Sequence, residues 1–315
     1  MPNYNGVWSL STQYQNASGW GFTGIPSAVF AGGETRTTTI EFIKIETDGN
    51  ALDFGDLTRE HGGGASAAAS STRALFAGGK DSYTNVIDFI TFATTGNATD
   101  FGDLSGAVKQ GPSGLSNGTR GVFAGGSIND NDRINVIEYV TIASAGNVTD
   151  FGNLTADRRN TSAFASTTRG VVNGGTTDSA NSDIMDYITT GTTGNATDFG
   201  NLLAATETIA GCSSATRGLI AGGFTDAVIN VIQYVTIAST GNASDFGDLV
   251  RVSSGVSGVS TATKAVFAGG SNDSGVFTTL QKVTIASTGN AAEFGDLIQT
   301  NSKASGASAS HGGIA

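Results

Sequence analysis

The feature that most constrains the fold of this chain is a sequence repeat with a period of roughly 48 residues. A hydrophobic segment ending in two glycines occurs six times, and its second glycine is Gly33, Gly79, Gly126, Gly175, Gly223 and Gly270. A second marker, DFG(D/N)L or EFGDL, has its aromatic residue at Phe54, Phe101, Phe151, Phe199, Phe246 and Phe294. Both markers recur at intervals of 46 to 50 residues. A fixed period of this length is typical of solenoids and propellers, in which each repeat packs on the next.

Each repeat contains four segments with the character of strands. Residues 135–144 (NVIEYVTIAS) are β-branched or aromatic on both alternating faces, which is expected of a strand covered on both sides. Gly146-Asn147 follows and predicts a tight hairpin, because glycine adopts positive φ. The DFG marker lies on the next strand, and a strand rich in Ser, Ala and Gly, such as 65–71, precedes the next double glycine. Four strands per repeat predict a propeller blade.

The C-terminal segment is predicted to close the ring. In the five internal repeats, 21 or 22 residues separate the leucine of DFG(D/N)L from the next double glycine, whereas only 18 residues follow Leu297. Residues 305–310 resemble the Ser/Ala-rich strand that the first repeat lacks. We therefore predict an all-β, six-bladed propeller over residues 27–315, with repeats that begin near 28, 74, 121, 170, 218 and 265. An open β-solenoid is the alternative.

Composition narrows the classes of partner. A net charge of −11 argues against nucleic acid, since phosphate binding needs a basic face. One cysteine, Cys212, excludes an intramolecular disulfide. We expect no membrane insertion, because no apolar run reaches the roughly 18 residues of a membrane helix, and the chain opens without a signal-peptide pattern.

Residues suited to catalysis are few. Six copies of DFG at a fixed period indicate a structural role, since a kinase needs one copy among other motifs. His61 and His311 are predicted in related parts of adjacent blades, either as a shared metal site or as two isolated histidines. Cys212 is predicted to be a packed thiol. We expect no enzyme activity, no catalytic residue, no metal centre and no cofactor.

The loops after the double glycines differ between repeats and are rich in Asp and Asn, as in 127–133, 176–183 and 271–275. Such loops can bind Ca²⁺, but turn formation explains these residues equally well. Strand direction places these loops and the connections after DFG(D/N)L on one rim. We expect this variable rim to contact ligands or partners.

The opposite rim is predicted to carry a ring of basic residues, namely Arg73, Arg120, Arg169, Arg217 and Lys264. This ring is interpreted either as a site for an anionic partner or as solubilising charges and surface ion pairs, which contribute little to stability.

Residues 1–26 lie outside the repeat and hold both tryptophans of the chain. Their aromatic residues are Tyr4, Trp8, Tyr14, Trp20 and Phe22. Trp and Tyr are typical interface anchors. We interpret the segment as an arm that docks onto a partner, with folding back over its own propeller as the alternative.

The repeat resembles the kelch repeat. The third unit matches it with Gly125-Gly126, with an acid and an aromatic at Glu138-Tyr139, with Phe151, and with Arg158 or Arg159. Three departures make the chain kelch-like: Phe replaces the usual Trp, a clear Arg occurs only at Arg59, Arg158/Arg159 and Arg251, and Lys282 replaces the aromatic in the last unit. The resemblance implies a propeller built of four-stranded blades.

The arm (residues 5–10, 13–15 and Trp20) and the AGG…DFGDL units also resemble tail-fibre and other virion proteins of marine, cyanophage-like tailed phages. This resemblance implies a virion structural protein that is assembled in the host cytoplasm. It would contact other virion proteins through the arm and a host-surface glycan or receptor through the propeller. The alternatives are a secreted or surface carbohydrate-binding propeller without a virion role and an enzyme built on the same scaffold.

Overall fold

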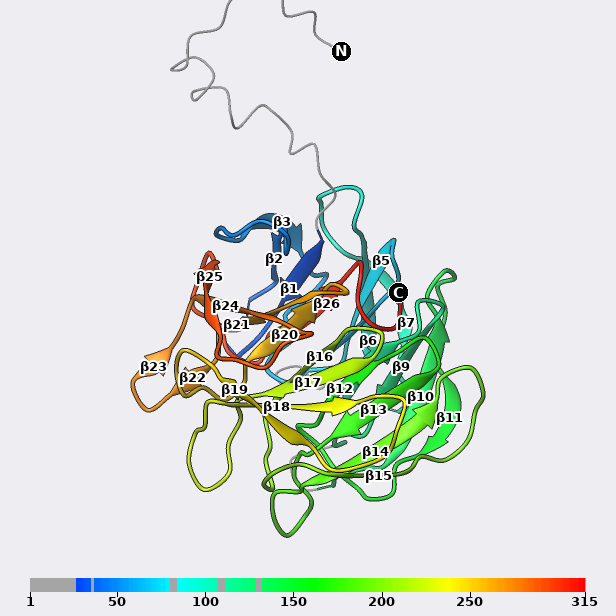
Figure 1. Ribbon diagram of the computed structural model, residues 1–315. Helices are drawn as coiled ribbons and strands as arrows, with labels where there is room; N and C mark the ends of the chain where they lie inside the picture. Colours follow the sequence, from blue (N-terminus) through cyan, green and yellow to red (C-terminus); the bar gives the residue numbers. More distant parts are fainter. Residues whose placement is uncertain (1–26, 35–36, 80–83, 107–110, 129–131, 315) are drawn as a thin grey trace, which may run out of the picture.

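The computed structural model describes residues 27–34, 37–79, 84–106, 111–128 and 132–314. Its strands form six four-stranded antiparallel sheets arranged around a common axis as a β-propeller, with no helix among the described residues (Figure 1). The predicted fold class is confirmed.

The blades follow the repeats, and the strands of each blade succeed one another from the axis outward. Blade 1 has β26 (Ser305–Ser308), β1 (Ala28–Ala31), β2 (Thr39–Ile43) and β3 (Leu52–Asp56). Blade 2 has β4 (Ser66–Ala69), β5 (Arg73–Ala77), β6 (Val86–Thr91) and β7 (Thr99–Asp103). Blade 3 has β8 (Ser113–Ser116), β9 (Arg120–Ala124), β10 (Val136–Thr141) and β11 (Thr149–Asn153).

The second half of the ring has the same order. Blade 4 has β12 (Ser162–Ala165), β13 (Arg169–Asn173), β14 (Ile184–Thr189) and β15 (Thr197–Asn201). Blade 5 has β16 (Ala210–Ser213), β17 (Arg217–Ala221), β18 (Val231–Thr236) and β19 (Ser244–Asp248). Blade 6 has β20 (Ser257–Ser260), β21 (Lys264–Ala268), β24 (Thr279–Thr284) and β25 (Ala292–Asp296), and its double-glycine loop forms a small hairpin of β22 (Ser271–Asn272) and β23 (Gly275–Val276).

The chain closes its own ring. β26 pairs antiparallel with β1, with Ser308 opposite Ala28 and Ser305 opposite Ala31 (Figure 1). The last strand of the sequence is therefore the inner strand of the first blade, as predicted. The alternative of an open solenoid is wrong.

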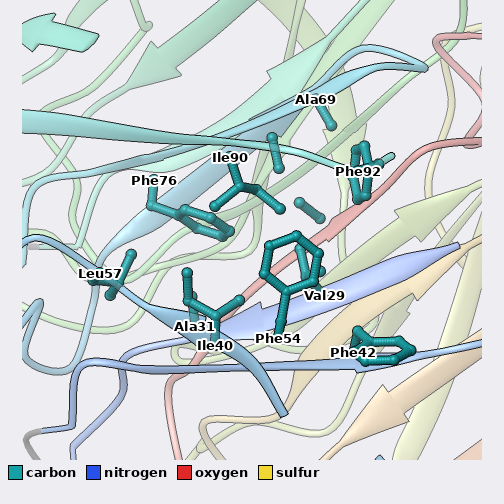
Figure 2. Packing of buried hydrophobic residues seen from close by; sticks show 12 residues of the cluster. Val29, Ala31, Ile40, Phe42, Phe54, Leu57, Ala69, Phe76, Ile90 and Phe92 are labelled. Atoms are coloured by element: carbon teal, nitrogen blue, oxygen red, sulfur yellow. The ribbon is translucent and has the colours of Figure 1, made fainter. Parts of the chain in front are cut away.

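The hydrophobic core lies between blades. The second strand of each blade is buried on both faces, as in β1, because its two faces contact the two neighbouring sheets. In Figure 2, Val29 and Phe54 of blade 1 meet Phe76 and Phe92 of blade 2. The DFG phenylalanine belongs to this core, since Phe54 is buried and each equivalent phenylalanine is too, which agrees with the predicted structural role of DFG.

The Gly-Asn segments do not form the predicted tight hairpins. Seven residues, 92–98, connect β6 and β7, and part of this connection binds the preceding blade. Gly96 N donates to Phe54 O at 2.7 Å, and Asp56 N donates to Asn97 Oδ1 at 3.1 Å. Equivalent bonds occur in all six blades, from Gly49, Gly96, Gly146, Gly194, Gly241 and Gly289. The Gly-Asn pair therefore satisfies the edge of a neighbouring sheet, which sequence alone does not distinguish from a turn.

The glycine of the DFG marker lies beside a bulge and at a close approach between blades. The register between β6 and β7 shifts so that Phe101 is an extra, bulged residue next to Gly102. Gly102 has φ +148°, and a Cβ there would lie within van der Waals overlap of the Gly146 carbonyl of the next blade. Glycine is required at this position by a close approach between blades.

We expect Gly102→Ala to lower the free energy of unfolding by about 2 kcal/mol more than Gly146→Ala, because only the first adds a clash to backbone strain. Gly146 has φ +157°, and nothing lies within 4 Å of the Cβ that alanine would add, so it is a matched control. Urea titration of both variants measures the difference. Equal losses would show that the close approach between blades carries no energetic weight.

Candidate functional site

The two rims of the propeller differ in what they carry. One rim, called the variable rim, carries the loops after the double glycines and the connections after DFG(D/N)L. The other, called the Thr-Arg rim, carries the Ser-x-Thr-Arg turns such as 70–73. The chain enters β1 from Ser27 on the Thr-Arg rim, and residues 309–314 follow β26 on that same rim. Entry and exit of the propeller thus share one face.

On the Thr-Arg rim, the predicted basic ring joins adjacent blades. The Arg73 guanidinium lies 4.9 Å from the centroid of the Phe89 ring, and its Nη1 donates to the Ala143 carbonyl of the next blade at 2.9 Å. The same stacking, over a tyrosine, is made by Arg120, Arg169 and Arg217. Lys264 instead pairs with Glu46. These cations contact neighbouring blades, and binding of an anionic partner by them stays a prediction.

A ring of buried acids and amides joins the blades near the variable rim. One side chain per blade occupies it: Glu41, Asp88, Glu138, Asp186, Gln233 and Gln281. Each accepts a backbone N–H from the residue after the leucine of the preceding DFG(D/N)L, as Asp88 Oδ2 does from Thr58 N at 2.9 Å. The same hydrogen bond satisfies a buried acceptor and links two neighbouring blades.

At two of these seams, which are the junctions between neighbouring blades, a buried basic side chain meets the acid. Arg158 Nη2 lies 2.6 Å from Asp186 Oδ2, and His61 Nε2 lies 3.2 Å from Asp88 Oδ2, with all four side chains fully buried. Burial raises the pKa of Asp88, but hydrogen bonds from His61 and Thr58 outweigh it and hold the pKa below its ordinary value. Charged partners are expected here because an unpaired buried charge is costly.

Two further seams carry neutral side chains on both sides. The positions equivalent to Arg158, four residues after the leucine of DFG(D/N)L, hold Thr206 and Ser253 where the facing residues are the neutral Gln233 and Gln281. We call the residue four after this leucine and the facing acid or amide a seam pair. At the closing seam, the equivalent residue is Asn301 and the acid is Glu41. Burial raises the pKa of the Glu41 carboxyl.

The arginines named in the sequence lie in different environments. Of the kelch-like arginines, only Arg158 is buried at a seam. Arg59 is exposed and reaches Thr84, while Arg251 is exposed and lies over the Phe277 ring. Their blades have His61 and Ser253 at that place.

Small residues line the central channel, so the inner strands approach one another closely and the channel is narrow. At the second position of the inner strands stand Ala67, Gly114, Ala163, Gly211, Gly258 and Gly306. A Cβ on Gly211 would lie 2.8 Å from the Ala163 carbonyl, so larger residues would force the strands apart. The remaining cavity is about 70 Å³. Cys212 lines it, and burial raises the pKa of its thiol, which agrees with the predicted packed thiol.

The C-terminal residues cover the channel on the Thr-Arg rim. His311 Nδ1 accepts from Gly313 N at 3.0 Å, so its other nitrogen, Nε2, carries the proton and lies 3.2 Å from the Ala69 carbonyl. Gly312 N donates to Ser213 O of blade 5 at 3.0 Å. The prediction that His61 and His311 occupy related places is wrong: His61 precedes its inner strand, whereas His311 follows one, so they lie at opposite rims.

Protonation of His311 should loosen this cover. Burial lowers the pKa of His311 from 6.5 to about 4. Above pH 6.5 neither the folded nor the unfolded form is protonated and stability is unaffected. Below it the unfolded chain takes up the proton first, so stability falls by up to about 1.4 kcal/mol per pH unit until the folded pKa is reached.

We therefore expect the free energy of unfolding of the protein to fall more steeply than that of His311→Asn between pH 6.5 and 4. Urea titrations of both proteins across this range give the difference, and the shared contribution of the other titratable groups cancels. Parallel curves would show that His311 is not held neutral in the channel cover.

At the variable rim, the channel mouth is encircled by six residues with left-handed backbone, one before each inner strand. They are Gly64, Gly111, Asn160, Thr208, Gly255 and Lys303. Hydrogen bonds link neighbours, as from Asn160 N to Gly111 O and from Thr208 N to Asn160 O. Asn160, Thr208 and Lys303 are the three non-glycine residues with positive φ in the described part of the chain. A cavity of about 90 Å³ lies among them, with Ile209 and Val256 in its wall.

Replacing Thr208 by glycine should stabilise the protein by about 1 kcal/mol, because a β-branched residue at φ +53° is strained and glycine is not. Thr208→Ala keeps most of the backbone strain and should give no such gain. Thermal unfolding of both variants distinguishes them. A loss of stability in Thr208→Gly would mean that contacts of the threonine side chain stabilise the protein by more than its backbone strain destabilises it.

Exposed hydrophobic side chains gather on one half of the variable rim. Six of the eight large hydrophobic residues that are exposed in the described part form a crescent over blades 4 to 6. The crescent consists of Leu203, Phe224, Val250, Val252, Val276 and Ile298. Leu203 is 52 % exposed and Ile298 is 53 % exposed. Exposed apolar surface that is concentrated in this way is a candidate contact face.

The Asp- and Asn-rich loop 176–183 forms turns, with Thr177 Oγ1 bonded to Ala180 O, and its Asp178 pairs with Arg133. Among the described residues no three His, Cys, Asp or Glu side chains cluster as metal ligands, and Ca²⁺ binding stays a prediction. The aromatic residues of the predicted arm, Tyr4, Trp8, Tyr14, Trp20 and Phe22, lie outside the described residues.

The described residues include no helix of the length and hydropathy needed to span a membrane. No protein-family model matches this chain, and no curated protein matches it significantly.

Proposed function

We propose that this chain is a non-enzymatic virion structural protein, a tail or capsid appendage of the fibre or decoration type. Residues 1–26 anchor it to another virion protein, and its kelch-like propeller is displayed for contact with proteins or the host surface. The observation that carries this proposal is that two features lie on opposite rims. The chain enters at the Thr-Arg rim, and the crescent lies on the variable rim.

The contacts between blades support a role in display. Three kinds of contact join neighbouring blades: a stacked or paired cation, a buried acceptor, and a Gly-Asn segment bound to a neighbouring sheet. Most seams have all three. A ring joined in this way holds its loops in fixed positions, as recognition by loops requires. The resemblance to tail-fibre and other virion proteins supplies the biological setting.

Deletion of residues 2–26 tests the proposal. The truncated protein should keep the circular-dichroism spectrum and melting temperature of the full chain but should be absent from purified virions, as measured by mass spectrometry. The full-length protein should be found there, and an antibody against the propeller should label a tail or capsid position. A truncated protein that unfolds, or that still enters virions, would refute the anchoring role.

A second function, carbohydrate binding by a secreted or surface propeller, is favoured by the channel mouth. Asn160, Thr208 and Lys303 line the cavity there with strained backbones, and strained non-glycine residues often mark binding sites. A glycan array probed with residues 27–315 tests this function. Binding that disappears in the triple glycine variant of these residues, whose backbone is relaxed, would support it.

A further inference from the structure

The crescent is not required by the fold. Leu203, Val250 and Ile298 follow DFG(D/N)L in blades 4 to 6, at the place where Thr58, Ser105 and Thr155 stand in blades 1 to 3. In blades 1 to 3 the hydroxyl donates to the buried acid of the next blade, as Thr58 Oγ1 does to Asp88 Oδ1 at 2.7 Å. The same backbone position thus accepts a polar residue, and half of the ring carries an exposed aliphatic one instead.

A segment that covers the crescent must be compatible with the negative charge of this protein. All 27 acidic and all 16 basic residues of the chain lie outside residues 1–26, so the propeller carries the whole net charge of −11. Residues 1–26 contain no Asp, Glu, Lys or Arg and supply five of the aromatic residues. A neutral, aromatic segment can cover an apolar surface on an acidic protein without burying a charge.

The attachment point of this segment and the crescent lie on opposite faces. Ser27 lies at the start of β1 on the Thr-Arg rim, and the crescent lies on the variable rim. When two copies stack in the same orientation, the Thr-Arg rim of one faces the variable rim of the next. An extended segment of 26 residues reaches at most about 90 Å, several times the roughly 17 Å height of a five-residue strand.

We propose that residues 1–26 of one copy dock on the crescent of a second copy, so that the propellers stack head to tail. The interface is heterologous, because the arm of one chain meets the rim of the other, and such interfaces extend into stacks unless another protein ends them. The inference rests on the proposed arm anchor and names its partner as a neighbouring copy of this chain.

Site-specific crosslinking tests the contact. One population of full-length chains carries Ser9→Cys, beside Trp8, and another with a different tag carries Ala227→Cys, in the turn between Phe224 and Val228. The native Cys212 does not compete, because it is buried and burial raises its pKa. The matched control is Ala238→Cys, an exposed alanine of the same blade beyond β18 on the Thr-Arg rim.

A short bis-maleimide should give the mixed-tag species at least about tenfold more efficiently with Ala227→Cys than with Ala238→Cys. The triple variant Leu203→Thr, Val250→Thr, Ile298→Thr, which copies blades 1 to 3, should lower that yield by about tenfold while the melting temperature is kept. Equal yields from the two alanine positions would overturn the inference. So would efficient crosslinking within one diluted chain that carries both cysteines, since the arm would then cover its own rim.

Failure of this inference is distinguishable from failure of the proposed function. If the arm deletion abolishes incorporation into virions but Ala227→Cys crosslinks no better than Ala238→Cys, the arm is an anchor whose partner is a different protein. If the deletion leaves incorporation intact, the anchoring role itself fails.

Discussion

Removal of residues 305–315 should unfold the whole ring and not blade 1 alone. β26 is the inner strand of blade 1, pairs with β1 along its full length, and packs between the inner strands of blades 2 and 6. Without it, β1 becomes an open edge and the ring has a gap at its axis. We expect a loss above about 5 kcal/mol, which is comparable to the total stability of many domains.

Circular dichroism and urea titration measure this effect. The matched control is deletion of residues 2–26, which is longer but removes no described strand. A synthetic peptide of residues 299–315 should restore folding of the truncated chain in a concentration-dependent manner, because a ligand that binds only the folded form stabilises it. Retention of a cooperative transition with near-native stability would show that the ring does not depend on its closing strand.

Arg158→Thr should destabilise the protein by about 3–5 kcal/mol, because it leaves the Asp186 carboxylate buried without its cation. Arg158 also donates to the Gly174 and Ile184 carbonyls at 2.7 Å, and these acceptors lose their partner too. Urea-induced unfolding gives the loss in the free energy of unfolding.

The ring itself supplies the rescue for this variant. Adding Asp186→Gln copies the Thr206 and Gln233 pair of the next seam, and the double variant should recover most of the lost stability. A double-mutant cycle then gives a coupling energy of about 2–3 kcal/mol. A double variant as unstable as Arg158→Thr alone would show that the seams are not matched in charge.

The architecture was predictable because its determinants are periodic. Six double glycines and six DFG phenylalanines fix the number of blades, and the short distance from Leu297 to the C-terminus identifies the closing strand. The Gly-Asn segments were misassigned because a turn pattern does not reveal that Gly96 donates to a strand of another blade.

The seam pairs were not predicted because no residue type repeats at their position. His61, Arg158, Thr206 and Ser253 have little in common until each is placed opposite its partner. A signal was nevertheless present: counting four residues from the leucine of DFG(D/N)L aligns them, and the basic residues then coincide with Asp while the hydroxyls coincide with Gln in four of the six repeats.

The channel mouth was hidden for a related reason. Gly64 and Gly111 lie seven residues after that leucine, but Asn160, Thr208 and Lys303 lie six residues after it. The shift by one residue removes the alignment, and only backbone geometry shows that these residues share one left-handed conformation. Exposure of the crescent likewise depends on how the connections lie over the blades.

The seam pairs also mean that the blades are not interchangeable parts. If blade 5 stood after blade 3, Arg158 would face Gln233 and a buried guanidinium would have no carboxylate. Arg158 therefore constrains which repeat follows blade 3, although the strands themselves are nearly alike. A lineage that lost blade 4 would have to change Arg158 as well, whereas loss of blade 5 would place Thr206 opposite Gln281 and leave no unmatched charge.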